Sequence, residues 1–158
     1  MIAPGTMLPD PVRPVFRVAA NPPDVHGTTH LLAILQDGSK YNALFFIGVR
    51  TLHEPHPVFQ AFIANCEPFS ASVRPVIVAR HFQIGGYRKP DWAGDDVLFL
   101  ATHTNLNERS YGLNGKGEMG VVLVRPDGYV AFSTAVEQNG SGLEEMANFM
   151  AKLFVKSS

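Results

Sequence analysis

Two histidines and a carboxylate lie within four consecutive residues, His53-Glu54-Pro55-His56, just before a predicted helix. An imidazole can move a proton near neutral pH, and imidazoles with a carboxylate are also common metal ligands. The positive end of the helix dipole would stabilise an anion beside them. The segment therefore predicts an acid–base site or a metal site. Because neighbouring side chains point apart in extended chain and no recognised metal spacing is met, the sequence favours a third interpretation, histidines of a solvated loop.

Three further residues could join this chemistry. His103 follows the apolar run 97–101, and Arg109 and Tyr111 precede a predicted hairpin. Side chains at strand ends on one edge of an open sheet meet where ligands bind. Tyr111 could supply a phenolic proton, and Arg109 could hold an enolate or a carboxylate. The alternative is that Tyr111 packs against the sheet with its hydroxyl hydrogen-bonded, which the sequence favours.

Cys66 is the only cysteine of the 158-residue chain. A single cysteine excludes a disulfide within the chain, a Cys-x-x-Cys redox pair, a cysteine-rich zinc site and an iron–sulfur cluster held by this chain alone. Its position on the apolar face of a predicted helix indicates a buried, unreactive side chain. The sequence also contains no Gly-x-Gly-x-x-Gly, so it offers no Rossmann site for a flavin. We therefore expect neither thiol chemistry nor a bound cofactor or metal.

The elements that must position these residues can be predicted from the apolar pattern. Six of the twelve prolines precede residue 24, which indicates an extended arm over 1–24 with one short edge strand at 15–18. An apolar cluster at 31–35 favours a helix over a strand. The runs 43–47 and 73–79 predict central strands, and 97–101 is apolar without a clear period. Apolar residues spaced by three and four predict a helix from Pro57 to Cys66, ended by Pro68.

The last third of the chain has stronger signals. Two strand-like runs flank Asp127-Gly128, which predicts a hairpin over 121–132. Ser141 and Glu144 have the spacing of a capping box, which predicts the start of a final helix with an apolar face that runs from Leu143 to Phe154. The order of elements is that of the thioredoxin fold. We therefore predict one α/β domain over 1–158, with a mixed central sheet and helices on both faces.

One motif resembles a known family. The step Tyr111-Gly112-Leu113, a glycine-rich gap and the strand 120–130, which ends Arg-Pro-Asp-Gly-Tyr-Val, are similar to the carboxy-terminal thioredoxin-like domain of flavin-dependent aromatic hydroxylases of the phenol hydroxylase type. Pro4-Gly5-Thr6 and the run 44–46 agree less specifically. Phe132-Ser133 departs from the family, which often has Trp and Arg there. The resemblance implies a domain used for subunit contacts, here without the flavin-binding part.

Charge and hydropathy limit the partners. Thirteen Lys and Arg against fourteen Asp and Glu give a net charge of −1, so no broad basic field exists to attract nucleic acid or an anionic membrane. The longest apolar runs are about five residues, too short for a membrane span. The amino terminus lacks the pattern of a signal peptide. We therefore expect a cytoplasmic protein that binds neither nucleic acid nor membranes.

Two hypotheses for function remain open, and so does whether the protein is an enzyme. The first is a non-redox accessory or dimerisation protein of aromatic or polyketide metabolism, which forms a homodimer or binds a flavin monooxygenase. The second is a cofactor-free enzyme that isomerises, cyclises or opens a phenolic or polyketide-like substrate by acid–base catalysis, and thus binds an aromatic small molecule. Its catalytic residues would be His53, His56, His103, Arg109 and Tyr111.

Overall fold

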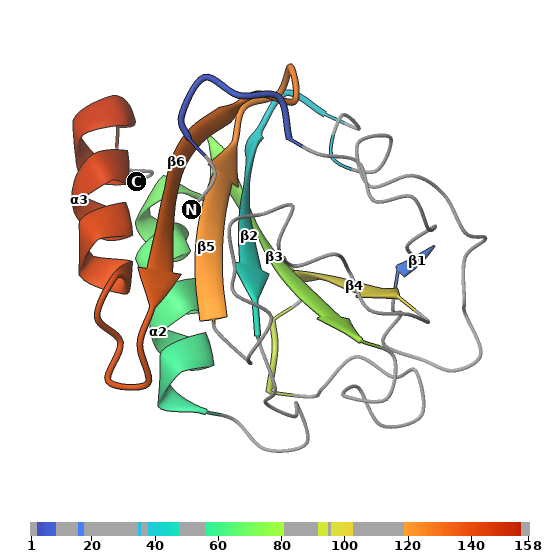
Figure 1. The fold of residues 1–158 in the computed structure, drawn as a ribbon, viewed down its shortest axis with the longest axis vertical. Coiled ribbons are helices and arrows are strands. Elements are labelled where there is room, and N and C mark those ends of the chain that lie inside the picture. Colours follow the sequence, from blue (N-terminus) through green and yellow to red (C-terminus); the bar gives the residue numbers. More distant parts are fainter. Residues whose placement is uncertain are drawn as a thin grey trace.

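The computed structural model describes residues 3–8, 16–17, 35, 38–47, 56–80, 92–94, 96–102 and 119–155. Within these residues the chain forms one six-stranded sheet in the order β1-β4-β3-β2-β5-β6 (Figure 1). The strands are β1 (Phe16–Arg17), β2 (Tyr41–Phe46), β3 (Val73–Arg80), β4 (Leu98–Thr102), β5 (Met119–Val124) and β6 (Val130–Val136). The helices are α2 (Pro57–Cys66), the short 3₁₀ helix η1 (Glu67–Phe69) and α3 (Leu143–Leu153).

The sheet is mixed, as predicted. Strands β2, β3 and β4 are parallel, whereas β5 and β6 form an antiparallel hairpin beside β2. The run 97–101, whose apolar pattern left its type open, forms most of β4 and pairs with β3. The predicted edge strand at 15–18 forms at Phe16–Arg17, antiparallel to β4. The carboxyl ends of β2, β3 and β4 therefore share one edge of the sheet.

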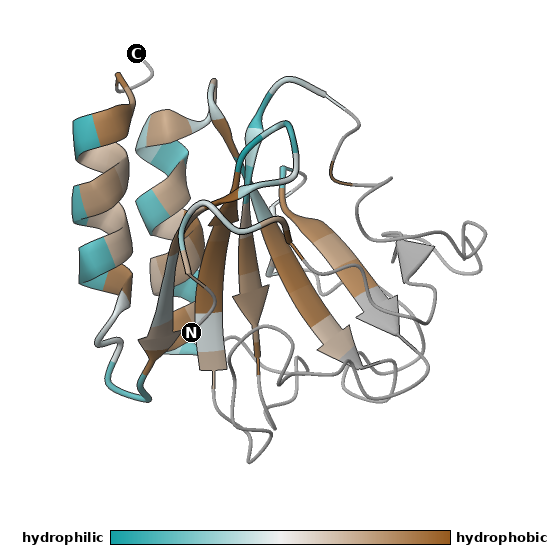
Figure 2. Ribbon diagram, turned by 45° about the horizontal axis from the view of Figure 1, so that its top comes forward, coloured by the Kyte–Doolittle hydropathy of each residue, from teal (hydrophilic) through white to brown (hydrophobic). Residues whose placement is uncertain are grey.

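Apolar residues pack on both faces of the sheet. Helices α2 and α3 lie together on one face, where they cover Phe45 and Ile77 (Figure 1). On the other face, Leu8 and Leu35, which is itself helical, pack against Leu44 and its neighbours. Among the described residues, the strands are accordingly the most hydrophobic part, whereas each helix also carries hydrophilic residues (Figure 2). This confirms that the run 43–47 is a central strand buried on both faces.

Helix α2 forms as its residue spacing predicts. Pro57 occupies the first turn, where a missing N–H leaves no hydrogen bond unmade. Phe59, Phe62 and Cys66 are buried at intervals of three and four residues, which places them on one side of the helix. The α-helix ends at Cys66 and the chain continues through η1, which contains Pro68.

The predicted hairpin is also present. Its turn is closed by a short ion pair in which Arg125 Nη2 donates to Asp127 Oδ2 at 2.6 Å, and Gly128 has a φ of 89°. Glycine adopts this left-handed conformation without the penalty that a Cβ would bring. The residues that carry the family resemblance therefore build the hairpin turn, as predicted for Asp127-Gly128.

The beginning of the chain runs beside this turn. The Gly5 N–H donates to the Val130 carbonyl and the Val130 N–H donates to Thr6, both at 2.8 Å. The Leu8 N–H donates to the Gly128 carbonyl at 2.9 Å, and the Leu8 side chain is buried. This part of the arm therefore extends the sheet at the start of β6.

The N-cap of α3 lies one residue later than predicted, at Gly142 instead of Ser141. The helix begins at Leu143, its N-cap is Gly142, and no side chain caps it, so Ser141 and Glu144 do not form a capping box. Gly142 has a φ of 100°, and a Cβ there would overlap the carbonyl oxygen of Ala135 on β6. The close packing of the chain against β6, rather than side-chain capping, thus sets the helix start.

Candidate active-site edge and buried cysteine

The edge of the sheet where β2, β3 and β4 end also receives the amino end of α2 (Figure 1). In open α/β sheets this is the edge at which ligands bind, because loops and a helix amino terminus converge there. All five predicted catalytic residues were expected at this edge. His56 is one of the described residues, and it stands at the N-cap of α2.

His56 makes a defined contact with its own helix. Its backbone is extended, with φ −105° and ψ 138°, and its Nδ1 accepts a hydrogen bond from the Val58 N–H at 3.2 Å. The acceptor must be an unprotonated nitrogen, so this bond exists only while Nδ1 carries no proton. The imidazole also lies 5.6 Å from the Phe59 ring, centroid to centroid. His56 therefore caps the helix at the candidate edge.

An aromatic cluster connects this helix start to β4. The rings of Phe59 and Trp92 stack at 6.1 Å, and Trp92 meets Phe99 edge-on at 6.2 Å. Trp92 is half-buried, and its ring joins the start of α2 to β4. Sequence reasoning missed the connection between Trp92 and His56 through Phe59, because the residues are more than thirty positions apart and no spacing rule links them.

The other predicted site residues, His53, His103, Arg109 and Tyr111, lie outside the described residues, as does Glu54 of the predicted metal set. Their convergence with His56 stays a prediction. Within the part of the chain that the structure describes, no three His, Cys, Asp or Glu side chains gather closely enough to hold a metal ion.

Cys66 lies at the opposite end of α2 from His56. Its side chain is 1% exposed, and burial raises the pKa of the thiol to about 12. A thiolate, not a thiol, is the nucleophile in peroxide reduction and in disulfide exchange. The prediction of a buried cysteine is confirmed, and this residue stays protonated at neutral pH.

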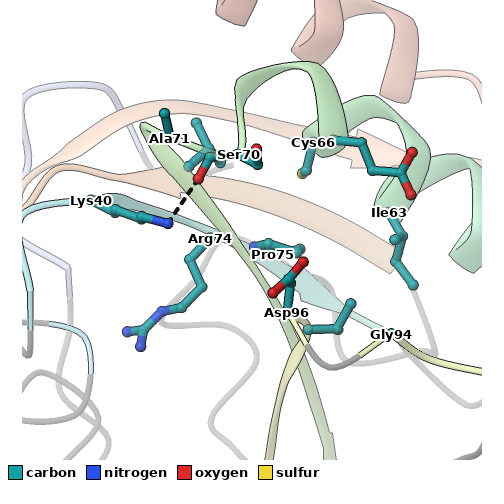
Figure 3. A pocket seen from close by; sticks show the side chains of 12 residues that line it. Lys40, Ile63, Cys66, Ser70, Ala71, Arg74, Pro75, Gly94 and Asp96 are labelled. Carbon is teal, nitrogen blue, oxygen red and sulfur yellow. Dashed lines mark hydrogen bonds between the residues drawn. The ribbon is translucent and has the colours of Figure 1, made fainter. Parts of the chain in front are cut away.

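A pocket of about 720 Å³ opens at that same end of the molecule, beyond Cys66 (Figure 3). Charged residues from three separate segments line it, among them Lys40, Arg74 and Asp96. Sequence analysis missed this pocket, since nothing in the spacing of these residues indicates that they meet. The proline within the β3 run, Pro75, is the one signal of an irregular strand edge that the sequence offers.

No protein-family model and no curated protein sequence matches the chain. Its structure, however, is similar to several solved structures. Mycobacterium tuberculosis AhpC matches with a TM-score of 0.66 at 16% identity, over 97% of this chain and 93% of that chain. The reduced 2-Cys peroxiredoxin of Plasmodium vivax matches with a TM-score of 0.60 at 13% identity, over 96% of each chain. BsSco, a member of the Sco family of cytochrome c oxidase assembly proteins, matches with a TM-score of 0.61 at 12% identity, again over 96% of each.

These similarities settle the fold class. The chain has a thioredoxin-like fold. Identities this low show the fold alone and carry no activity with them. Two of these proteins, a 2-Cys peroxiredoxin and a protein with a disulfide switch, use pairs of cysteines, whereas Cys66 is the only cysteine of this chain.

No helix within the described residues is long and apolar enough to cross a membrane.

Proposed function

We propose that this protein is a non-redox thioredoxin-like accessory protein that acts by association, either with a second copy of itself or with a flavin monooxygenase, in aromatic or polyketide metabolism. The observation that carries the non-redox part is the position of Cys66, which is buried at the far end of α2 with its pKa raised to about 12. The metabolic context rests on the resemblance of the segment 120–130 to the carboxy-terminal domain of aromatic hydroxylases.

The hairpin turn supplies a surface for such association. Met7 and Tyr129 are neighbours across a β-bridge and are 50% and 39% exposed. The Arg125 guanidinium lies 5.9 Å from the centre of the Tyr129 ring. Tyr, Met and Arg are enriched at protein interfaces, and Tyr and Arg supply much of the binding energy there. We name Met7, Arg125 and Tyr129 the turn surface and assign the partner contact to it.

Sedimentation of the purified protein, alone and mixed with a flavin-dependent aromatic hydroxylase of the phenol hydroxylase type, tests the association. A dimer or a mixed complex that weakens at least tenfold in Tyr129→Ser supports the proposal, since a hot-spot residue contributes about 2 kcal/mol. The matched control is Lys152→Met, on the exposed side of α3. A monomer that forms no complex contradicts it.

Peroxide consumption and disulfide reduction test the non-redox part. We expect the wild-type protein and Cys66→Ala to give the same background rate with each reductant. A rate that depends on Cys66 would overturn the assignment, because a thiol with a pKa near 12 forms too little thiolate at pH 7 to act as a nucleophile.

The second hypothesis, a cofactor-free acid–base enzyme, is favoured by the imidazole of His56 beside the aromatic cluster of Phe59 and Trp92. The exchange of the central CH₂ protons of 2,4-pentanedione into deuterated water, followed by NMR, is a direct assay for proton abstraction next to a carbonyl. Catalysis by the wild-type protein that His56→Asn removes would support this function. Asn also caps helices well, so this variant removes the imidazole and retains the cap. A wild-type rate equal to that of buffer alone contradicts it.

A further inference from the structure

The pocket beyond Cys66 lies at the opposite end of the sheet from the candidate edge. It opens between the carboxyl end of α2, the first residues of β3 and the segment that leads into β4 (Figure 3). Its volume of about 720 Å³ is in the range of pockets that bind small organic molecules.

The pocket exists because β3 is longer than its neighbour β4. Strand β3 pairs with β2 from Val73 onward, but its pairing with β4 begins only at Val76. The Tyr41 N–H on β2 donates to the Ser72 carbonyl, so the backbone polar groups of residue 72 point toward β2. Because these groups alternate in direction along a strand, the backbone of Pro75 points toward β4. Pro75 has no N–H to offer a further strand. The sheet therefore keeps an open notch beside residues 73–75.

Two cationic side chains, Lys40 and Arg74, lie on one side of this notch, and each donates a hydrogen bond to a neighbouring residue. Lys40 Nζ donates to the Ser70 carbonyl at 2.8 Å, and Arg74 Nε donates to Asn42 Oδ1 at 2.9 Å. Asn42 is itself buried and donates to the Leu35 carbonyl, which fixes its orientation. An ammonium has three donors, and the bond to Ser70 uses one of those of Lys40.

Two carboxylates, those of Glu67 and Asp96, also line the pocket. Both residues are exposed, and within the described part of the chain neither side chain forms an ion pair with Lys40 or with any other group. Glu67 directly follows the carboxyl end of α2, where the helix dipole also favours a positive group. In Figure 3, Lys40 and Arg74 extend on one side, whereas Asp96 and Ile63 lie toward the other.

The surface between the charges is apolar. Ile63 and Cys66 contribute from α2, Val73 and Pro75 from β3, and Val97 from the segment before β4. All except Ile63 are buried side chains, so this floor is part of the packed core and keeps its shape. A ligand with an apolar body would shield this floor from water.

We propose that this pocket binds a small organic acid whose apolar body separates a carboxylate from a hydrogen-bond donor. The carboxylate meets Lys40 and Arg74, the body covers the floor around Pro75, and the donor faces Glu67 and Asp96. The donor is an ammonium at the far end of an ω-amino acid or a hydroxyl at the far end of a hydroxy acid. This site is independent of the proposed association and of His56.

Calorimetric titration with four probes tests the assignment. 4-(Aminomethyl)phenylacetate carries a carboxylate and an ammonium at opposite ends of its ring, and 4-hydroxyphenylacetate carries a carboxylate and a hydroxyl. Phenylacetate carries the carboxylate alone, and 2-phenylethylamine carries the ammonium alone. We expect saturable binding of at least one of the first two, with the two single-group probes roughly tenfold weaker, since a charge-assisted hydrogen bond contributes about that factor. Whichever of these two acids binds more tightly identifies the donor as an ammonium or a hydroxyl.

Three variants locate the binding. Lys40→Met should weaken the best acid about tenfold and leave 2-phenylethylamine unchanged, whereas Asp96→Asn should weaken the donor-bearing acid and leave phenylacetate unchanged. Ala71→Phe fills the pocket and should abolish binding. Lys152→Met and Glu137→Gln are matched controls on exposed sites away from the pocket. Circular dichroism confirms that each variant is folded.

Two results overturn the proposal. One is that neither 4-(aminomethyl)phenylacetate nor 4-hydroxyphenylacetate binds the wild-type protein saturably. The other is equal binding by the wild-type protein, Asp96→Asn and Ala71→Phe, which would place the ligand elsewhere. Because Asp96 has no partner among the described residues, Asp96→Asn tests the site even if Lys40→Met fails to fold.

Discussion

Gly142, at the start of α3, tests how tightly this helix is held against the sheet. Two glycines near this start, Gly140 and Gly142, have positive φ values of 86° and 100°. An added Cβ at Gly140 meets no atom within 4 Å, whereas one at Gly142 would overlap the carbonyl oxygen of Ala135 and lie 3.4 Å from Thr134 Cγ2. Both sites therefore disfavour a side chain through their positive φ, and Gly142 alone adds a steric contact.

This difference gives a magnitude. Alanine in a left-handed conformation costs about 1–2 kcal/mol, which is the full expectation for Gly140→Ala. Gly142→Ala adds an overpacking penalty of about 1–3 kcal/mol, because the obstructing atom belongs to the backbone of β6 and cannot rotate away. We expect a total loss of about 2–5 kcal/mol from the free energy of unfolding, a large part of the roughly 5–15 kcal/mol of a typical domain.

Urea unfolding of the wild-type protein and both variants, followed by the fluorescence of Trp92 and by circular dichroism, measures these losses. Equal m-values would show that the same surface unfolds in all three. A Gly142→Ala variant that fails to fold, beside a folded Gly140→Ala, agrees with the prediction. Equal stability of the two variants would refute the reasoning that the contact with Ala135 sets the start of α3.

Three further perturbations follow from single contacts. His56→Ala should lower the free energy of unfolding by about 1 kcal/mol and His56→Asn by much less, as measured by urea unfolding, because Asn retains the acceptor for the Val58 N–H. Asn42→Leu should lower the free energy of unfolding by about 1–3 kcal/mol in the same assay, since it leaves the buried Leu35 carbonyl without its donor. A loss below about 0.5 kcal/mol would contradict this. Burial raises the pKa of Cys66 in the folded protein to about 12, so between pH 9 and pH 12 the unfolded state loses this proton first. As pH rises through this range, the free energy of unfolding of the wild-type protein should fall by up to about 1.4 kcal/mol per pH unit more than that of Cys66→Ala. Parallel pH profiles of the two proteins would contradict the burial argument.

Much of the fold could be predicted because local patterns agreed with the packing. The run 43–47, the spacing of Phe59, Phe62 and Cys66, and the pair Asp127-Gly128 each have one stable conformation in any α/β context, and all three predictions are confirmed. The run 97–101 could not be assigned, since five apolar residues suit a strand or a buried helix equally well. Its pairing with β3 decided the matter.

The candidate site was less accessible to prediction. The sequence places His56 before a helix, but only the geometry shows that Nδ1 caps this helix and that its ring meets the aromatic cluster. The notch beside Pro75 arises from the offset between β3 and β4, which depends on register rather than on residue type. Its two cations, Lys40 and Arg74, lie more than thirty residues apart.

The sequence by itself determined what chemistry is unavailable and which elements form. One cysteine excludes an internal disulfide, and the period of the apolar residues distinguishes α2 from β2. The tertiary structure alone decided where the start of α3 lies, that Cys66 is held as a neutral thiol, and that charges from three segments surround one pocket. The physical reason is that steric contact, desolvation and charge proximity depend on distances in space, which residue spacing along the chain does not specify.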